Sequence, residues 1–280
     1  MSGAARGPAA VTIGGTSIAL RTSDKPFLRM LEARYGAFID CSGSRRCDDE
    51  FELELESPAD TSPDDELRVF RRDGCWHMER GDFRAHWDPA ARRGKVRQSR
   101  NPYAIDAVLR IVHTLLLAGQ GGALMHAASA IRDGKAYVFA GVSGAGKTTL
   151  ARLAPGDVRV LSDEVSCVRK TAGGYRAYGT PFSGELAQPG ENVDAPLAAI
   201  YLLAQGAENR VEPVSKAVAA RAVLANTLFF AQDAQLVRAV FNSGIELAQQ
   251  VPVLRLTFVP DARVWELIGT RRDMLMETVA

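Results

Sequence analysis

Apolar and polar side chains alternate along much of the first ninety residues. Residues 51–56, Phe-Glu-Leu-Glu-Leu-Glu, alternate strictly, which predicts a strand with one buried face and one face in water. Glycine pairs and an Asp-Gly step separate the neighbouring apolar runs, and such steps favour tight turns between strands. We therefore expect a small β-rich N-terminal domain over residues 1–95. Its expected elements are a hairpin over 11–20, a helix over 27–35, and strands over 51–56, 66–71, 75–79 and 83–87.

Helical spacing of apolar residues begins after Asn101-Pro102. Asparagine caps the first N–H groups of a helix and proline fits its first turn, so this pair predicts a helix start. The apolar positions that follow predict a helix of about seventeen residues that buries one face. His113 lies among those positions, and we interpret it as a packing residue. No uninterrupted apolar run is long enough for a membrane helix, so we expect no membrane partner.

Strands and helices are mixed in the rest of the chain. The pattern predicts a hairpin of strands 124–131 and 136–140, a short helix from residue 147 that stops at Pro155, and further elements to the end. We expect an α/β domain with a mixed sheet over residues 96–280. Its later elements are expected at 158–161, 165–170, 175–178, 196–203 and 253–258 as strands, and at 215–227, 233–243 and from 264 as helices.

Charge and cysteine content narrow the class of protein. The 280 residues carry a formal net charge of +1, so we expect no nucleic-acid partner. Residues 91–100 hold five basic side chains and no acidic one; we interpret them as a solvated linker in preference to an electropositive strip. The four cysteines form no Cys-x-x-Cys pair and no disulfide framework, which favours free thiols in a cytoplasmic protein.

A glycine-rich loop follows the apolar residues 136–140 and precedes a helix. Its spacing, glycine, four residues, glycine, lysine and threonine, is that of a phosphate-binding loop. Backbone N–H groups of such a loop surround phosphate oxygens, the lysine reaches the β and γ phosphates, and the hydroxyl binds Mg²⁺. We therefore predict that the chain binds a nucleoside triphosphate. The residues expected to contact it are Gly141, Ser143, Gly144, Ala145, Gly146, Lys147, Thr148 and Thr149.

Acidic residues follow the loop closely. Asp163 and Glu164 stand at the end of the expected strand 158–161, and Asp163 is sixteen residues after Lys147. Carboxylates at a strand end beside such a loop suit a magnesium site or a catalytic base. Glu185 ends a turn-rich loop over 179–185 and is a candidate for the other side of the metal.

Four motifs in this order resemble the HPr kinase/phosphorylase family. They are His126-Ala, the Ser-Gly-Ala-Gly-Lys of the loop, Ser-Asp-Glu at 162–164, and Gly-Thr-Pro-Phe at 179–182. The resemblance is closer to the HPr-kinase-like proteins found in peptide and cofactor biosynthesis clusters. It covers residues 124–203 and implies a P-loop domain with the fold shared with PEP carboxykinase, preceded by the β-rich unit.

The resemblance also implies roles for individual residues. Asp163 corresponds to the acid/base that takes the proton of the acceptor hydroxyl, Lys147 to the phosphate lysine, and His126 to the active-site histidine. The Pro-Gly-Arg loop linked to the family's reverse reaction is absent, so the arginine that steadies the phosphoryl group remains open among Arg210, Arg221 and Arg255. The implied magnesium ligands are Thr148, Glu164 and Glu185, with the choice between Asp163 and Glu164 open.

These observations lead us to expect an ATP- and Mg²⁺-dependent kinase that phosphorylates a hydroxyl, with a serine of a peptide or small protein as acceptor. A small-molecule kinase of the same fold is one alternative. A nucleotide-binding module without catalysis, whose N-terminal unit serves as a docking surface, is another. The resemblance to a hexameric family further implies a homo-oligomer.

Overall fold

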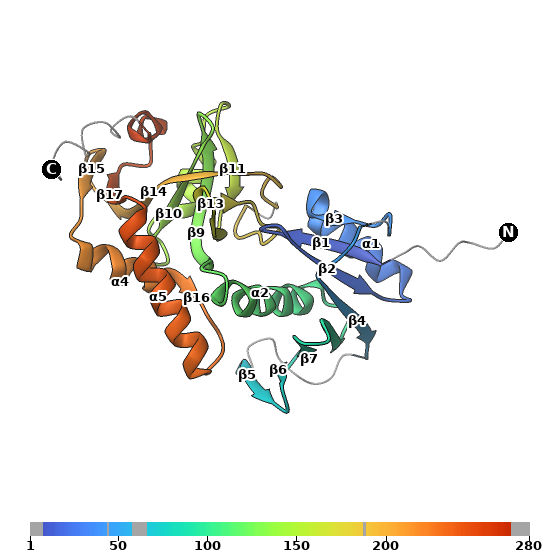
Figure 1. Ribbon diagram of the computed structural model, residues 1–280. Coiled ribbons are helices and arrows are strands. Elements are labelled where there is room, and N and C mark those ends of the chain that lie inside the picture. The colour runs from blue at the N-terminus through green and yellow to red at the C-terminus, as the bar shows by residue number, and fades with distance from the viewer. Residues whose placement is uncertain (1–7, 44, 58–65, 187–188, 270–280) are drawn as a thin grey trace. The chain divides into compact units, whose positions relative to one another are not determined.

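Two sheets organise the computed structural model, which describes residues 8–43, 45–57, 66–186 and 189–269 (Figure 1). The chain divides into two units. One holds Met1–Gly119 with Phe229–Arg238, and the other holds Gln120–Leu228 with Ala239–Ala280. Both sheets are mixed, so the coarse α/β expectation is confirmed.

The first unit is β-rich, as the alternating patterns predicted. Its eight-stranded sheet has the order β3-β1-β2-β4-β8-β7-β6-β5, in which β2, β4 and β8 run parallel and the other neighbours antiparallel. The strictly alternating segment becomes β4, with Phe51 and Leu53 buried and Glu52 exposed. The strands are β1 (Ala9–Ile13), β2 (Thr16–Arg21), β3 (Ile39–Asp40), β4 (Asp49–Leu55), β5 (Arg68–Arg72), β6 (Cys75–Arg80), β7 (Phe83–Asp88) and β8 (Arg93–Gln98).

The interpretation of residues 91–100 as a linker is wrong. Six of them form β8, which lies between β4 and β7 in the middle of the sheet. Its basic side chains face the glutamates of β4: Lys95 contacts Glu54, and the Arg97 Nε lies 2.9 Å from the Glu54 Oε2. Cross-strand pairing therefore balances the charge, and the segment is not an electropositive strip.

The helices of the first unit begin at residues that cap them. In α1 (Lys25–Tyr35) the Asp24 carboxylate accepts the Phe27 N–H at 2.8 Å, and in α2 (Pro102–Ala118) Asn101 accepts the Tyr103 N–H at 2.9 Å. A short 3₁₀ turn (Gly36–Phe38) follows α1. Buried Asp106 of α2 bonds the Tyr35 hydroxyl at 2.7 Å.

Because α2 packs on α1 and β8, it groups with the first unit, and the division falls at Gly119 rather than at residue 95. His113 is 1% exposed and bonds the Leu109 carbonyl at 2.7 Å through Nδ1, as expected of a packing residue.

The second unit is built on a nine-stranded sheet. Its main path is β10-β9-β12-β13-β14-β17-β15, with an additional pairing of β10 to β14, while β11 and β16 pair with β9. Strands β10, β14 and β17 are parallel, so their carboxyl ends lie at one edge. The strands are β9 (Ala123–Arg132), β10 (Lys135–Ala140), β11 (Arg159–Ser162), β12 (Val165–Thr171), β13 (Gly174–Tyr178), β14 (Asp194–Gln205), β15 (Arg210–Pro213), β16 (Thr227–Leu228) and β17 (Val253–Phe258).

Two of the predicted C-terminal helices differ in extent or type. Besides α3 (Lys147–Arg152) and α4 (Lys216–Asn226), the structure has α5 (Ala234–Gln250), which continues beyond the predicted end at residue 243. Gly244 lies inside this helix. A Cβ at that position would lie 2.6 Å from Leu224 Cδ2, so the glycine permits close packing of α4 on α5. The expected last helix is a 3₁₀ turn (Ala262–Leu267), and residues beyond 269 lie outside the described part.

Apolar side chains pack on both faces of the second sheet. One cluster includes Val138, Ile200 and Val223 of α4, and the other includes Phe139, Leu150 of α3 and Trp265. In the described ranges, no helix has the length and apolar character needed to cross a membrane.

Candidate functional site

The 141–148 loop leaves the carboxyl end of β10 and enters α3. Gly144 and Gly146 have φ values of +77° and +104°, a region that side chains with a Cβ rarely adopt. A Cβ at Gly146 would also lie 2.6 Å from the Phe258 ring at the end of β17. Both glycines are therefore required by the backbone path of the loop.

Lys147 begins α3 and is held by the loop itself. Its side-chain Nζ donates to the Gly141 carbonyl at 2.9 Å and to the Val142 carbonyl at 3.2 Å, and the residue is 8% exposed. Burial lowers the pKa of Lys147, and the nearby Glu164 carboxylate opposes that shift. The ammonium group therefore lies at the centre of the loop, where an anion would meet it.

Gln205 of β14, which was not among the predicted site residues, supports the loop from the neighbouring strand. The Gln205 side chain, at the end of β14, donates to the Gly144 carbonyl at 2.8 Å. Its position became informative only with the pairing of β10 to β14, which brings the end of β14 beside the loop. The sequence itself carried only one weak signal, a polar residue at the end of an apolar strand.

Asp163 and Glu164 form the turn between β11 and β12. The Ser162 hydroxyl accepts the backbone N–H of Glu164 at 3.1 Å and that of Val165 at 2.9 Å, which shapes this turn. Strand pairing then sets His126 of β9 opposite Val165. His126, Lys147 and Asp163, which are distant in sequence, line one cavity.

The Asp163 carboxylate is buried and fixes the following loop. Its Oδ1 accepts the Gly184 N–H at 2.9 Å, its Oδ2 accepts the Leu186 N–H at 3.0 Å, and the residue is 4% exposed. A Cβ at Gly184 would lie 3.0 Å from both Asp163 Oδ2 and Glu164 Oε2. Both carboxylates thus approach the same small space, which a glycine leaves open.

These residues surround a cavity of about 610 Å³. Of the predicted site residues, Gly141 and Ala145 do not line it; Ala145 is buried in the core behind the loop. Ser183 and Gly184 also line it, although only Glu185 of these three neighbours was a predicted site residue. The lining residues are His126, Ser143, Gly144, Gly146, Lys147, Thr148, Thr149, Asp163, Glu164, Ser183, Gly184 and Glu185.

The carboxylates on the cavity wall suit a hard cation that keeps other ligands. Glu164 and Glu185 line the cavity with the Thr148 hydroxyl, but no group of three or more acidic, histidine or cysteine side chains arranged for metal binding occurs in the described part of the chain. Mg²⁺ usually takes one or two protein carboxylates and completes its shell with phosphate and water. These residues therefore fit a Mg²⁺ ion that is also bound by phosphate and water, and they do not fit a metal site made of protein ligands alone.

None of the three arginines left open by the sequence lines this cavity. Arg210 and Arg255 line a separate cavity of about 390 Å³, where Arg210 bonds Glu212 at 3.0 Å. Arg221 lies exposed on α4. Arg152 of α3 instead lies 4.0 Å from the Glu185 carboxylate on the cavity wall.

One comparison with known proteins bears on the chain. A family model described as SynChlorMet cassette protein ScmC matches residues 98–271. No curated protein matches the chain. The family match spans well over half of the sequence and includes every residue that lines the cavity.

Proposed function

The chain belongs to the SynChlorMet cassette protein ScmC family, and we propose that it is an ATP- and Mg²⁺-dependent kinase that transfers the γ-phosphate to a hydroxyl. The acceptor in this proposal is a serine of a peptide or small protein. We further infer that the second unit has the fold shared by HPr kinase and PEP carboxykinase.

One observation carries the proposal. A single cavity holds the lysine and hydroxyl of the glycine loop, the Asp163–Glu164 turn and His126. Phosphoryl transfer needs little more than positioning and charge neutralisation, so a loop, a metal and a base suffice.

In this proposal the loop N–H groups and Lys147 hold the triphosphate. Asp163 accepts the proton of the acceptor hydroxyl. Although each Asp163 oxygen already accepts one backbone N–H, each retains a second lone pair for that hydroxyl. The two backbone bonds keep the carboxylate in place, which favours a positioned base.

Mg²⁺ would be held by the Thr148 hydroxyl together with Glu164 or Glu185, and would neutralise charge on the phosphates when bound. The Asp163 carboxylate points toward the same space as Glu164. His126 would contact the transferring group from β9.

The proposal is tested by Asp163→Asn with radiolabelled ATP, Mg²⁺, and panels of serine peptides and small hydroxyl compounds. Losing a positioned base reduces the rate by about 10²–10⁴. We expect transfer by the parent protein and a loss of that size in the variant, with ATP affinity retained. Full transfer by Asp163→Asn would show that another group is the base.

The matched control is Asp157→Asn, which changes an exposed carboxylate that pairs with Arg132 outside the cavity. Because an asparagine amide cannot accept both backbone N–H groups, Asp163→Asn also needs a melting curve and an ATP titration. Parent protein that binds ATP but phosphorylates nothing in either panel would support the nucleotide-binding module instead.

A further inference from the structure

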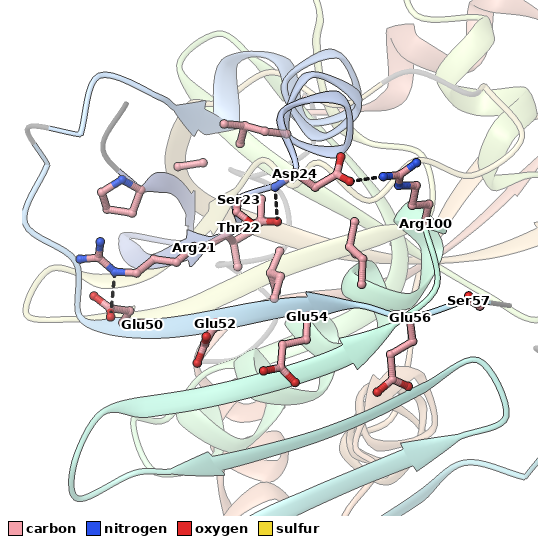
Figure 2. Close-up of a pocket in the computed structure, with 16 residues that line it drawn as sticks. Arg21, Thr22, Ser23, Asp24, Glu50, Glu52, Glu54, Glu56, Ser57 and Arg100 are labelled. Atoms are coloured by element: carbon pink, nitrogen blue, oxygen red, sulfur yellow. Dashed lines mark hydrogen bonds and ion pairs between the residues drawn. The ribbon is translucent and has the colours of Figure 1, made fainter. Parts of the chain in front are cut away.

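A groove of about 1200 Å³ lies on the first unit, beside β4. Figure 2 shows Glu50, Glu52 and Glu54 of this strand, and Glu56 directly after it, projecting from one side. The other wall comes from the end of β2 and the start of α1. None of its lining residues belongs to the cavity of the second unit.

Strand β4 has a hydrogen-bonding partner on both sides for only part of its length. Its pairing with β2 ends at Arg21↔Glu52, whereas its pairing with β8 continues to Leu55↔Gln98. After Arg21 the chain turns toward α1: the Thr22 hydroxyl accepts the Asp24 N–H at 3.1 Å, and the Asp24 carboxylate caps α1 by accepting the Phe27 N–H at 2.8 Å. Within the described residues, the second half of β4 is therefore an open edge.

Backbone direction shows which groups this edge presents. The Glu56 N–H donates to the Gln98 carbonyl of β8 at 2.8 Å. Backbone groups of successive residues in a strand point to opposite sides, so the N–H and C=O of Leu55 point away from β8 and into the groove. An exposed edge of this kind can accept an added strand.

The side chains beside the edge select the chemistry of that strand. On one face of β4, Leu53 is buried and Leu55 is partly exposed, and Leu28 of α1 lines the same groove. On the other face, the Glu52 and Glu56 side chains are 64% and 59% exposed, and their nearest cations are 4.0 Å away. An added strand would therefore meet apolar surface and carboxylates at alternate positions.

The remaining charges leave the groove acidic. Glu50 pairs with Arg21 at 2.8 Å, Asp24 contacts Arg100, and Glu54 contacts the basic residues of β8. Glu52 lies 4.0 Å from Lys95 and Glu56 lies 4.0 Å from Arg97. Figure 2 shows two of these pairs, Arg21 with Glu50 and Arg100 with Asp24.

We propose that the open half of β4 binds an extended peptide segment with alternating apolar and basic side chains, which pairs with β4 as an added strand. The inference does not depend on the proposed kinase activity. Main-chain bonds to Leu55 give it affinity, and Glu52 and Glu56 select its basic residues.

The test uses the full chain and a fluorescein-labelled Lys-Val-Lys-Val-Lys-Val-Lys peptide, followed by fluorescence anisotropy. We expect Glu52→Lys combined with Glu56→Lys to weaken binding by about tenfold or more. The same double reversal at Glu208 and Glu212, on the β15 side of the second unit, is the control and should leave binding unchanged.

A second variant separates strand pairing from charge attraction. Leu55→Pro removes the N–H that faces the groove, while the bond of Glu56 to β8 is retained. Both this variant and a probe N-methylated at every internal residue should bind about tenfold more weakly, since each removes main-chain donors whichever direction the added strand runs. Equal binding of the methylated probe would overturn the proposal, because charge alone would then explain the affinity.

Hydrogen exchange provides an independent readout at one amide. Exchange of the Leu55 N–H should be fast in the protein alone and slowed by the probe. Protection without probe would overturn the proposal by showing that another part of the chain, or a second copy, already covers the edge. Sedimentation would distinguish those two cases.

Discussion

Two glycines, one in the 141–148 loop and one in the loop that follows β13, show how single residues set the site. Gly146 combines a positive φ with a close approach to Phe258, and Gly184 leaves space that Asp163 and Glu164 share. The first requirement is a backbone conformation, and the second is a shape. Both follow from the absence of a Cβ, which no other residue type provides.

Gly146→Ala should therefore damage the loop. The left-handed conformation costs an L residue about 1–2 kcal/mol, and the contact with the Phe258 ring adds to that cost. We expect a lower melting temperature and a loss of ATP affinity, measured by calorimetry. Gly156→Ala is the matched control, since a Cβ there meets nothing within 4 Å; an equal loss of affinity in both variants would contradict the argument.

At the scale of elements, β8 is the case in which local sequence misleads. Residues 91–100, which include β8, hold five basic side chains, a composition typical of a solvated linker. Val96 of β8 is nevertheless 0% exposed, and it pairs with Ala85 and Leu53 on the two neighbouring strands. Its charges lie on one face because strand side chains alternate. The glutamates of β4 supply the opposite charge that a strand of this composition needs.

Two substitutions on β8 compare the contribution of its buried apolar residue to stability with that of a basic residue. Val96→Ala should lower the free energy of unfolding by about 2–3 kcal/mol, because it removes buried methyl groups and leaves a cavity. Lys95→Ala should change it by about 0–1 kcal/mol, since its pair with Glu54 is partly exposed. Urea denaturation measures both free energies of unfolding. If neither substitution changed the free energy, residues 91–100 would behave as a linker.

The whole molecule is organised in two units, and the boundary between them follows Gly119 instead of the expected residue 95. Helix α2 belongs by its contacts to the first unit, although the family match begins at residue 98, before this helix. Apolar side chains on most of its surface are buried, among them Ile105, Val108 and Val112. A domain that begins at residue 96 would carry this helix without the sheet on which it packs.

Fragments provide a test of that boundary. A fragment of residues 96–280 should expose the apolar surface of α2, bind a hydrophobic dye and aggregate more than a fragment of residues 120–280. Dye fluorescence and light scattering at equal concentration measure the difference. A better-behaved longer fragment would mean that α2 belongs with the second unit.

The sequence by itself determined the features that short stretches of chain encode. The alternation in β4, the Asn101 cap of α2 and the glycine spacing of the loop each depend on neighbours within a few residues, and each predicted its element correctly. The candidate residues His126, Lys147 and Asp163 were also identified in this way, because each belongs to a short motif.

Only the tertiary structure decided which distant segments meet. The pairing of β10 with β14 brings Gln205 to the loop, the register of β9 with β12 brings His126 to the acidic turn, and β2 leaves half of β4 open. Strand pairing is a contact between residues far apart in the chain, so no local pattern specifies its partner or register. The helix predicted to end at residue 243 continues through Gly244 for the same reason, because the contact of Gly244 with Leu224 of α4 is a tertiary one.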